Sequence, residues 1–118
     1  MRFRVRVRQE RPERPELDRL ILKQLRGKGA KLALPRHVLH FLDFPDEASA
    51  RGAADEVEGI GFDATVVAPT RDAEQWTVRG EATRVVDETT VDTHRKQFER
   101  IAAAHDGEYD GWEAAAEP

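Results

Sequence analysis

Residues 108–113 read Glu-Tyr-Asp-Gly-Trp-Glu, and this stretch is the most informative part of the 118-residue chain. It holds the only tyrosine and one of the two tryptophans, and it follows a segment with helical periodicity. Asp-Gly indicates a turn or a bulge, since glycine adopts backbone angles that other residues resist. Tyr and Trp combine a large apolar body with a polar tip, so they lie at the edge of a core or at an interface. Residues 109–114 are therefore expected to form the last strand, which two aromatic rings either pin to the sheet or offer to a partner.

The segment at residues 35–44 predicts a strand with bulky apolar groups on both faces. Such a strand is typical of the centre of a sheet that is covered on both sides. The main helices would cover one face, and a helix over residues 17–25 or a second copy of the chain would cover the other. Hydrophobic periodicity also predicts two helices and two strands between these segments and the last strand. The helices are expected at residues 45–59 and 89–104, and the strands at 62–67 and 75–86.

After the first helix, the expected order is strand, helix, strand, strand, helix, strand. This order is the split βαβ pattern of ferredoxin-like folds. We therefore expect an α+β fold, a ferredoxin-like sandwich (βαββαβ) in which two helices cover one face of an antiparallel sheet. The helix over residues 17–25 is an addition at the amino-terminal side.

The amino-terminal residues 1–8 alternate between arginine and apolar residues, which indicates a strand. A charged linker punctuated by two prolines follows at residues 10–16. We therefore expect a basic arm with a linker at 1–16 and one domain at 17–118. The arm is either an edge strand or a tail that orders on contact. Arginine pairs well with phosphate, so RNA contact is an alternative role for Arg2, Arg4, Arg6 and Arg8.

Charge is distributed unevenly along the chain. Residues 1–15 contain six Arg and two Glu, a net charge of +4, so the other 103 residues carry −8 of the total of −4. From residue 106 onward there are five acidic residues and no Lys or Arg. An acidic body repels nucleic acid and favours basic protein partners. With no cysteine, no apolar run of membrane-span length and no secretory signal, we expect a cytoplasmic protein without disulfides.

No motif in the sequence predicts an enzyme, a cofactor or a metal site. Residues 59–64 resemble a dinucleotide fingerprint, but they close an expected helix and open a strand, the reverse of the order that the fingerprint requires. His37 and His40 are three apart on an expected strand and so face opposite sides. His94 and His105 lie about three turns apart on one helix, too far to share a metal. Ser49 is the only serine and lies in an Ala-rich helix, without an aimed base.

Three stretches resemble the RraB family, regulators of ribonuclease activity B. They are residues 29–41, residues 53–62 and, most specifically, residues 102–113 with the Tyr-Asp-Gly-Trp motif directly after a helix end. The resemblance implies a ferredoxin-like domain with a non-catalytic role, which binds ribonuclease E and lowers its cleavage of RNA. The basic arm departs from the family, whose well-known members have long acidic extensions.

The expected partner is ribonuclease E or another basic RNA-processing protein, and neither direct nucleic-acid contact nor membrane contact is expected. The alternatives are an RNA-binding domain that acts through the basic arm, and a self-associating module, for example a homodimer. The candidate partner-binding residues are Glu108, Tyr109, Asp110, Gly111, Trp112 and Glu113.

Overall fold

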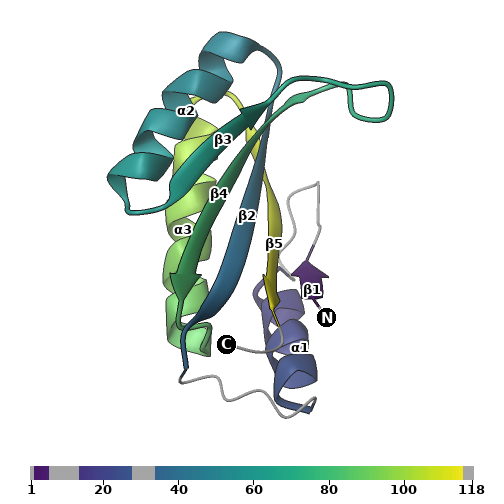
Figure 1. Cartoon of the computed structure of the whole chain (residues 1–118), viewed down its shortest axis with the longest axis vertical. Coiled ribbons are helices and arrows are strands. Elements are labelled where there is room, and N and C mark those ends of the chain that lie inside the picture. Colours follow the sequence, from purple (N-terminus) through teal and green to yellow (C-terminus); the bar gives the residue numbers. More distant parts are fainter. Residues whose placement is uncertain (1, 6–13, 28–33, 116–118) are drawn as a thin grey trace.

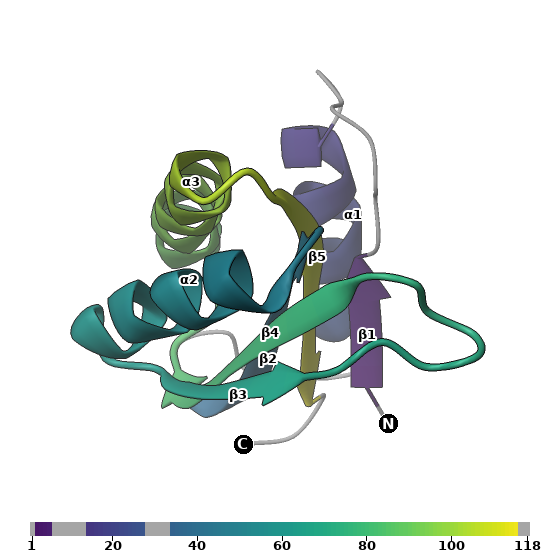
Figure 2. The same ribbon diagram turned by 90° about the horizontal axis from the view of Figure 1, so that it is seen from above.

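The computed structural model of the chain describes residues 2–5, 14–27 and 34–115. Its elements follow the order β1 (Arg2–Val5), α1 (Arg14–Gly27), β2 (Arg36–Phe44), α2 (Glu47–Gly59), β3 (Asp63–Val67), β4 (Trp76–Arg84), α3 (Glu88–Ala104) and β5 (Glu108–Ala115). The five strands form one antiparallel sheet in the order β1-β5-β2-β4-β3. All three helices lie on the same side of this sheet (Figures 1 and 2). The predicted α+β class is confirmed, and the order β5-β2-β4-β3 is compatible with a ferredoxin-like sheet.

The first described residues form the outer strand β1, which pairs with β5. Arg2 lies opposite Ala115 in this register, and Arg4 lies opposite Glu113. Of the two alternatives for the arm, residues 2–5 therefore follow the edge strand. Arg6 and Arg8 lie outside the described residues, and the division into an arm and a domain stays a prediction.

Helix α1 begins at Arg14, within the stretch predicted as linker. Pro15 is compatible with this start, because the first helical turn does not need its missing N–H group. Leu22 lies on the inner side of this helix and is buried, whereas Leu20 is 55% exposed. With Leu22 turned inward, α1 packs on the same side of the sheet as α3. It therefore does not cover the second face of the central strand, and that alternative is wrong.

Helix α2 lies close to the sheet because its inner face consists of small residues, as the sequence predicts. The helix begins two residues later than expected: Asp46 is the N-cap, and its carboxylate accepts a hydrogen bond of 2.8 Å from the Ser49 amide. The only serine of the chain thus donates its backbone N–H group to the cap. Aspartate is one of the residues preferred at the N-cap position. The buried residues of the inner face are Ala50, Ala53, Ala54 and Val57.

Helix α3 begins at a capping box formed by Asp87 and Thr90. At its other end, the Gly107 amide donates a hydrogen bond of 2.8 Å to Ala102, as in a Schellman motif. The left-handed residue of this motif is Asp106, with a φ of 61°. Apart from the arginine at position 95, the inner face is apolar: Val91, Phe98, Ile101 and Ala102.

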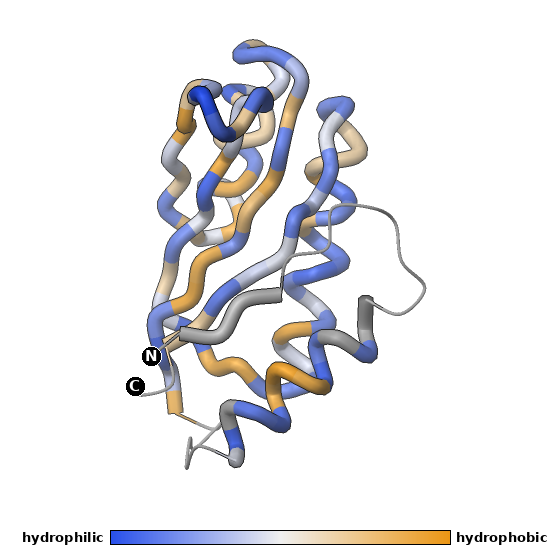
Figure 3. The backbone as a smooth tube through the Cα atoms, turned by 90° about the vertical axis from the view of Figure 1, so that its right-hand side faces the viewer, coloured by the Kyte–Doolittle hydropathy of each residue, from blue (hydrophilic) through white to orange (hydrophobic). Residues whose placement is uncertain are grey.

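The core fills the space between the helices and the sheet. Hydrophobic and hydrophilic residues alternate along the strands, as Figure 3 shows, so that one side of each strand faces the helices. Trp112, Phe44, Phe98 and Leu42 are the largest fully buried aromatic and aliphatic side chains. Within the described part of the chain, no helix has the length and apolar character that a membrane span requires.

Candidate partner-binding site

The Asp-Gly pair of the predicted binding segment forms a β-bulge in β5. Along β2, Phe41 lies opposite Gly111 and Leu42 lies opposite Tyr109, so Asp110 is an extra residue in β5. Gly111 has a φ of 105°, a conformation that glycine adopts at little cost. In a regular strand, residues three apart face opposite sides. The bulge changes this spacing and turns Tyr109 and Trp112 to the same, helix-covered side.

Tyr109 is part of an aromatic cluster between β2, β5 and α3. Its hydroxyl lies 2.7 Å from Nδ1 of His40 and forms a hydrogen bond with it. The rings of Tyr109 and His40 both stack on Phe98, at centroid distances of 5.9 and 4.2 Å. His94 and Phe62 approach His40 edge-on. Since Tyr109 is only 4% exposed, its ring stabilises the core.

Trp112 connects three elements through one buried carboxylate. Its Nε1 donates a hydrogen bond of 2.9 Å to Oδ1 of Asp18 in α1. The second oxygen of Asp18 accepts a hydrogen bond of 3.2 Å from Nε of Arg95 in α3. Arg95 also pairs with Asp92 and, at 3.1 Å, with Glu99. The indole therefore joins β5 to the two helices that pack beside it.

Asp18 and Arg95 were not predicted as functional or structural residues from the sequence. Arg95 lies four residues after Val91 and three before Phe98, both buried, so it occupies the apolar face of its helix. Asp18 lies four residues before Leu22, which is also buried. A charged residue at an inward position is a signal of a buried pair, because an isolated buried charge is costly. The partner of such a residue cannot be deduced from spacing, since Asp18 and Arg95 are 77 residues apart.

The structure places the six predicted site residues mostly inside the molecule. Trp112 is fully buried, and Asp110 is buried in the bulge. Glu113 is half-buried, whereas Glu108 is exposed. A partner that docks on the folded chain can therefore contact the carboxylate of Glu108, but not the two aromatic rings.

The four histidines lie in separate environments, apart from one close pair. His37 pairs with Glu81 and His105 pairs with Glu56. His40 contacts the ring of His94 at a centroid distance of 5.8 Å, a proximity that the sequence did not predict. Among the described residues there is no group of three or more His, Cys, Asp or Glu side chains that could hold a metal ion.

The environment of His40 favours its neutral form. Burial lowers the pKa of His40 well below the ordinary 6.5, and the nearby His94 lowers it further. Burial also lowers the pKa of His94, with a further contribution from Arg84. Nε2 of His40 has no hydrogen-bond partner in the described part of the chain. The hydrogen bond between the Tyr109 hydroxyl and His40 thus joins β5 to a neutral histidine in the core.

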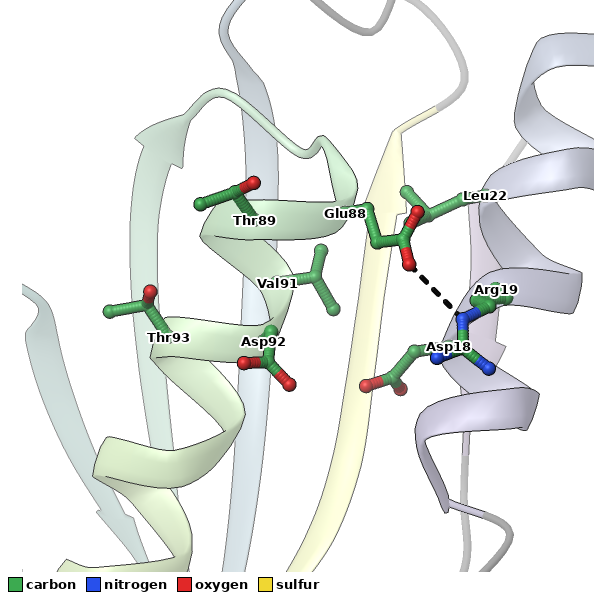
Figure 4. Close-up of a pocket in the computed structure, with 8 residues that line it drawn as sticks. All are labelled: Asp18, Arg19, Leu22, Glu88, Thr89, Val91, Asp92 and Thr93. Atoms are coloured by element: carbon green, nitrogen blue, oxygen red, sulfur yellow. Dashed lines mark hydrogen bonds and ion pairs between the residues drawn. The ribbon is translucent and has the colours of Figure 1, made fainter.

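A groove of about 410 Å³ lies between α1 and α3 (Figure 4). Arg19 and Glu88 form an ion pair of 3.1 Å across it, with side chains 60% and 70% exposed. Asp18, which accepts the hydrogen bond from Trp112, also lines the groove. The groove is thus open and polar, and existing ion pairs neutralise much of its charge.

The fingerprint-like residues 59–64 lie where the sequence analysis expected them. Gly59 is the last residue of α2, and Asp63 is the first residue of β3. A dinucleotide site needs the opposite order, a strand followed by the positive end of a helix. The segment is therefore a connection between two elements and has no phosphate-binding geometry.

Comparison with known proteins gives one match that covers nearly the whole domain. The model of the RraB family, described as regulator of ribonuclease activity B, matches residues 16–114. A comparison with curated protein sequences finds no match. The family match includes α1, the central strand and the bulged strand β5.

Proposed function

Because the chain belongs to the RraB family of regulators of ribonuclease activity, we propose that it binds ribonuclease E and lowers the rate at which this enzyme cleaves RNA. The family is regulatory and non-catalytic, so the effect comes from contact with a protein partner. The observation that carries the proposal is the family match over residues 16–114, which covers all three helices but for two residues and includes the Tyr-Asp-Gly-Trp strand.

The charge of the surface supports a basic partner segment. Asp106 and Glu108 are both exposed at the start of β5. The last turns of α2 and α3 contain no basic residue. Since the carboxyl-terminal end of a helix carries partial negative charge, acidic groups near it add to the negative potential. A partner rich in Lys and Arg would be attracted by this negative potential and would offset the repulsion between the acidic groups on binding.

Within the segment Glu108–Glu113, we assign the contact with the partner to Glu108, the one residue of the six that is exposed. Tyr109 and Trp112 act indirectly, because they hold β5 in the sheet. A Trp112→Ala variant would lose stability, by about 3–5 kcal/mol for a buried aromatic ring. It would therefore not separate binding from folding, and Glu108 is the better position for a test.

The test is a titration of the purified protein into an RNA-cleavage reaction of the host's own ribonuclease E. Saturable inhibition is expected. Glu108→Lys should raise the concentration for half-inhibition about two- to five-fold, the effect of one exposed charge contact. Glu16→Lys, at an exposed position of α1, makes the same change of charge outside the segment and is the control.

Two outcomes would contradict the proposal at different levels. Unchanged cleavage at high excess of folded protein would exclude ribonuclease E as the regulated enzyme. Inhibition that Glu108→Lys leaves unchanged would keep the function and exclude this residue from the contact surface.

A further inference from the structure

Strand β3 is an outer strand of the sheet, at the opposite end from β1. It consists of Asp63–Val67, and β4 is the only strand that pairs with it in the described part of the chain. Figure 2 shows β3 at the end of the sheet beneath α2. An outer strand has N–H and C=O groups without partners along its free edge, and these can pair with another extended chain.

This edge lacks Lys, Pro and a bulge, three of the features that prevent such pairing, although it is only five residues long and begins with a charged residue, Asp63. Proteins protect outer strands with Lys, Pro or bulges. Strand β3 contains none of these: it reads Asp-Ala-Thr-Val-Val, and its register with β4 is regular. Val67 is 39% exposed, which makes it one of three exposed large hydrophobic residues in the described chain. The opposite outer strand β1 differs, because it contains Arg2 and Arg4.

The charge beside the edge indicates which kind of chain it accepts. Helix α2 packs over β3 and β4 and contains four acidic residues and one arginine. Glu56 and Gly52 of α2 face His105 at the end of α3. By helical periodicity, Glu58 then lies on the side of α2 away from α3, above the free edge. Asp63 is exposed at the start of the strand.

A second copy of this chain fits the edge poorly. Pairing of β3 with β3 of another copy would bring two acidic α2 helices beside each other, and like charges at that distance repel. A strand with Lys or Arg residues meets opposite charges at Glu58 and Asp63. The complementary occupant is therefore a basic, extended segment of another protein.

We propose that the free edge of β3 binds a basic segment of the partner protein as an added strand. The backbone of the segment pairs with β3, as in β-strand addition, and its basic side chains contact Glu58 and Asp63. The identity of that partner as ribonuclease E rests on the proposed function above. The edge itself is defined by the strand order and the charges around it.

The experiment measures amide hydrogen exchange of the full chain with two probes, namely ribonuclease E and a synthetic peptide Arg-Phe-Arg-Val-Arg-Val-Arg that copies residues 2–8. Exchange of alternate amides in residues 63–67 should slow at least ten-fold when either probe is bound. Asp63→Lys and Glu58→Lys should each weaken the binding of ribonuclease E about two- to five-fold, because each removes an exposed attraction and adds a repulsion. Glu16→Lys, an exposed acid on α1, is the control with the same change of charge.

Each result decides between the two proposals. Inhibition of the ribonuclease without slower exchange in β3 would overturn the β3 site and leave the function intact. Failure to inhibit, with β3 protected by the peptide, would overturn the function and leave the site intact. Neither probe protecting β3 would overturn the site, and so would protection that rises with the concentration of the chain alone, since a second copy would then occupy the edge.

Discussion

The indole Nε1 of Trp112 donates a 2.9 Å hydrogen bond to the carboxylate of Asp18, 94 residues earlier in the chain. The bond joins the last strand to the first helix, and Arg95 of α3 completes the contact. Trp112 is fully buried and Asp18 is 4% exposed. Three elements that are separate in sequence are therefore held by one buried carboxylate.

Asp18→Ala should lower the free energy of unfolding by about 3 kcal/mol, because it leaves a buried guanidinium and the indole N–H without this acceptor. Arg95 keeps two other carboxylates, which places the effect at the lower end for a broken buried pair. Urea unfolding measures the change. Arg19→Ala, which breaks the exposed pair with Glu88, is the control and should cost less than about 1 kcal/mol. Equal effects of the two variants would show that the buried carboxylate has no special role.

Trp112→Phe should reduce stability without reducing inhibition. The variant keeps a buried ring but loses the bond to Asp18, which should cost about 1–3 kcal/mol. A tryptophan in direct contact with a partner typically contributes 2 kcal/mol or more to binding. Chemical unfolding and ribonuclease titration on the same preparation measure both quantities. A large loss of inhibition by a folded Trp112→Phe variant would mean that the indole is exposed when the partner binds.

The sequence predicted the elements of this fold better than the contacts between them. Periodicity located the inner faces of α2 and α3, since one face of each is small or apolar. In α1, leucine or isoleucine occurs at positions 17, 20, 21, 22 and 25, around more than one face. The pattern therefore could not show that Leu22 is buried and Leu20 exposed. That choice depends on Asp18 and its partners in α3 and β5.

The candidate site was predicted only in part, again because a local sequence pattern does not specify which side of an element is buried. Asp-Gly indicated a turn or a bulge, and the structure has a bulge there. A bulge of one residue reverses the sides on which later residues lie. Which face Trp112 occupies depends on whether the extra residue comes before or after it, and no local pattern specifies that position.

Stability should fall as the pH is lowered below about 6.5, because of His40 and His94. The pKa of each is lowered in the folded chain, so the unfolded chain binds protons that the folded chain does not. Stability is therefore complete above the unfolded pKa and decreases below it, by up to about 1.4 kcal/mol per pH unit for the fully buried His40 and by less for the partly solvated His94. The carboxylates with lowered pKa values, such as Asp46 and Asp87, act at lower pH, near and below 3.8.

Urea unfolding between pH 5 and 7.5 measures this dependence. His40→Phe should flatten the slope, although it also removes the partner of the Tyr109 hydroxyl and lowers stability at every pH. A wild-type stability that is constant from pH 7.5 to pH 5 would contradict the prediction.

Gly107→Ala should destabilise the fold, although the residue does not have a positive φ. A Cβ atom at position 107 would overlap the carbonyl oxygen of Asp43 and the ring of Phe44, so the β2–β5 region would have to shift. Such overpacking costs about 1–3 kcal/mol. Gly59→Ala is the matched control, because a Cβ there has no heavy atom within 4 Å. It should be neutral or stabilise the chain by up to about 1 kcal/mol, since alanine restricts the unfolded state. Thermal and urea unfolding of both variants measure the difference. A Gly107→Ala variant as stable as Gly59→Ala would contradict the prediction, because it would show that the Schellman turn can accommodate a Cβ atom.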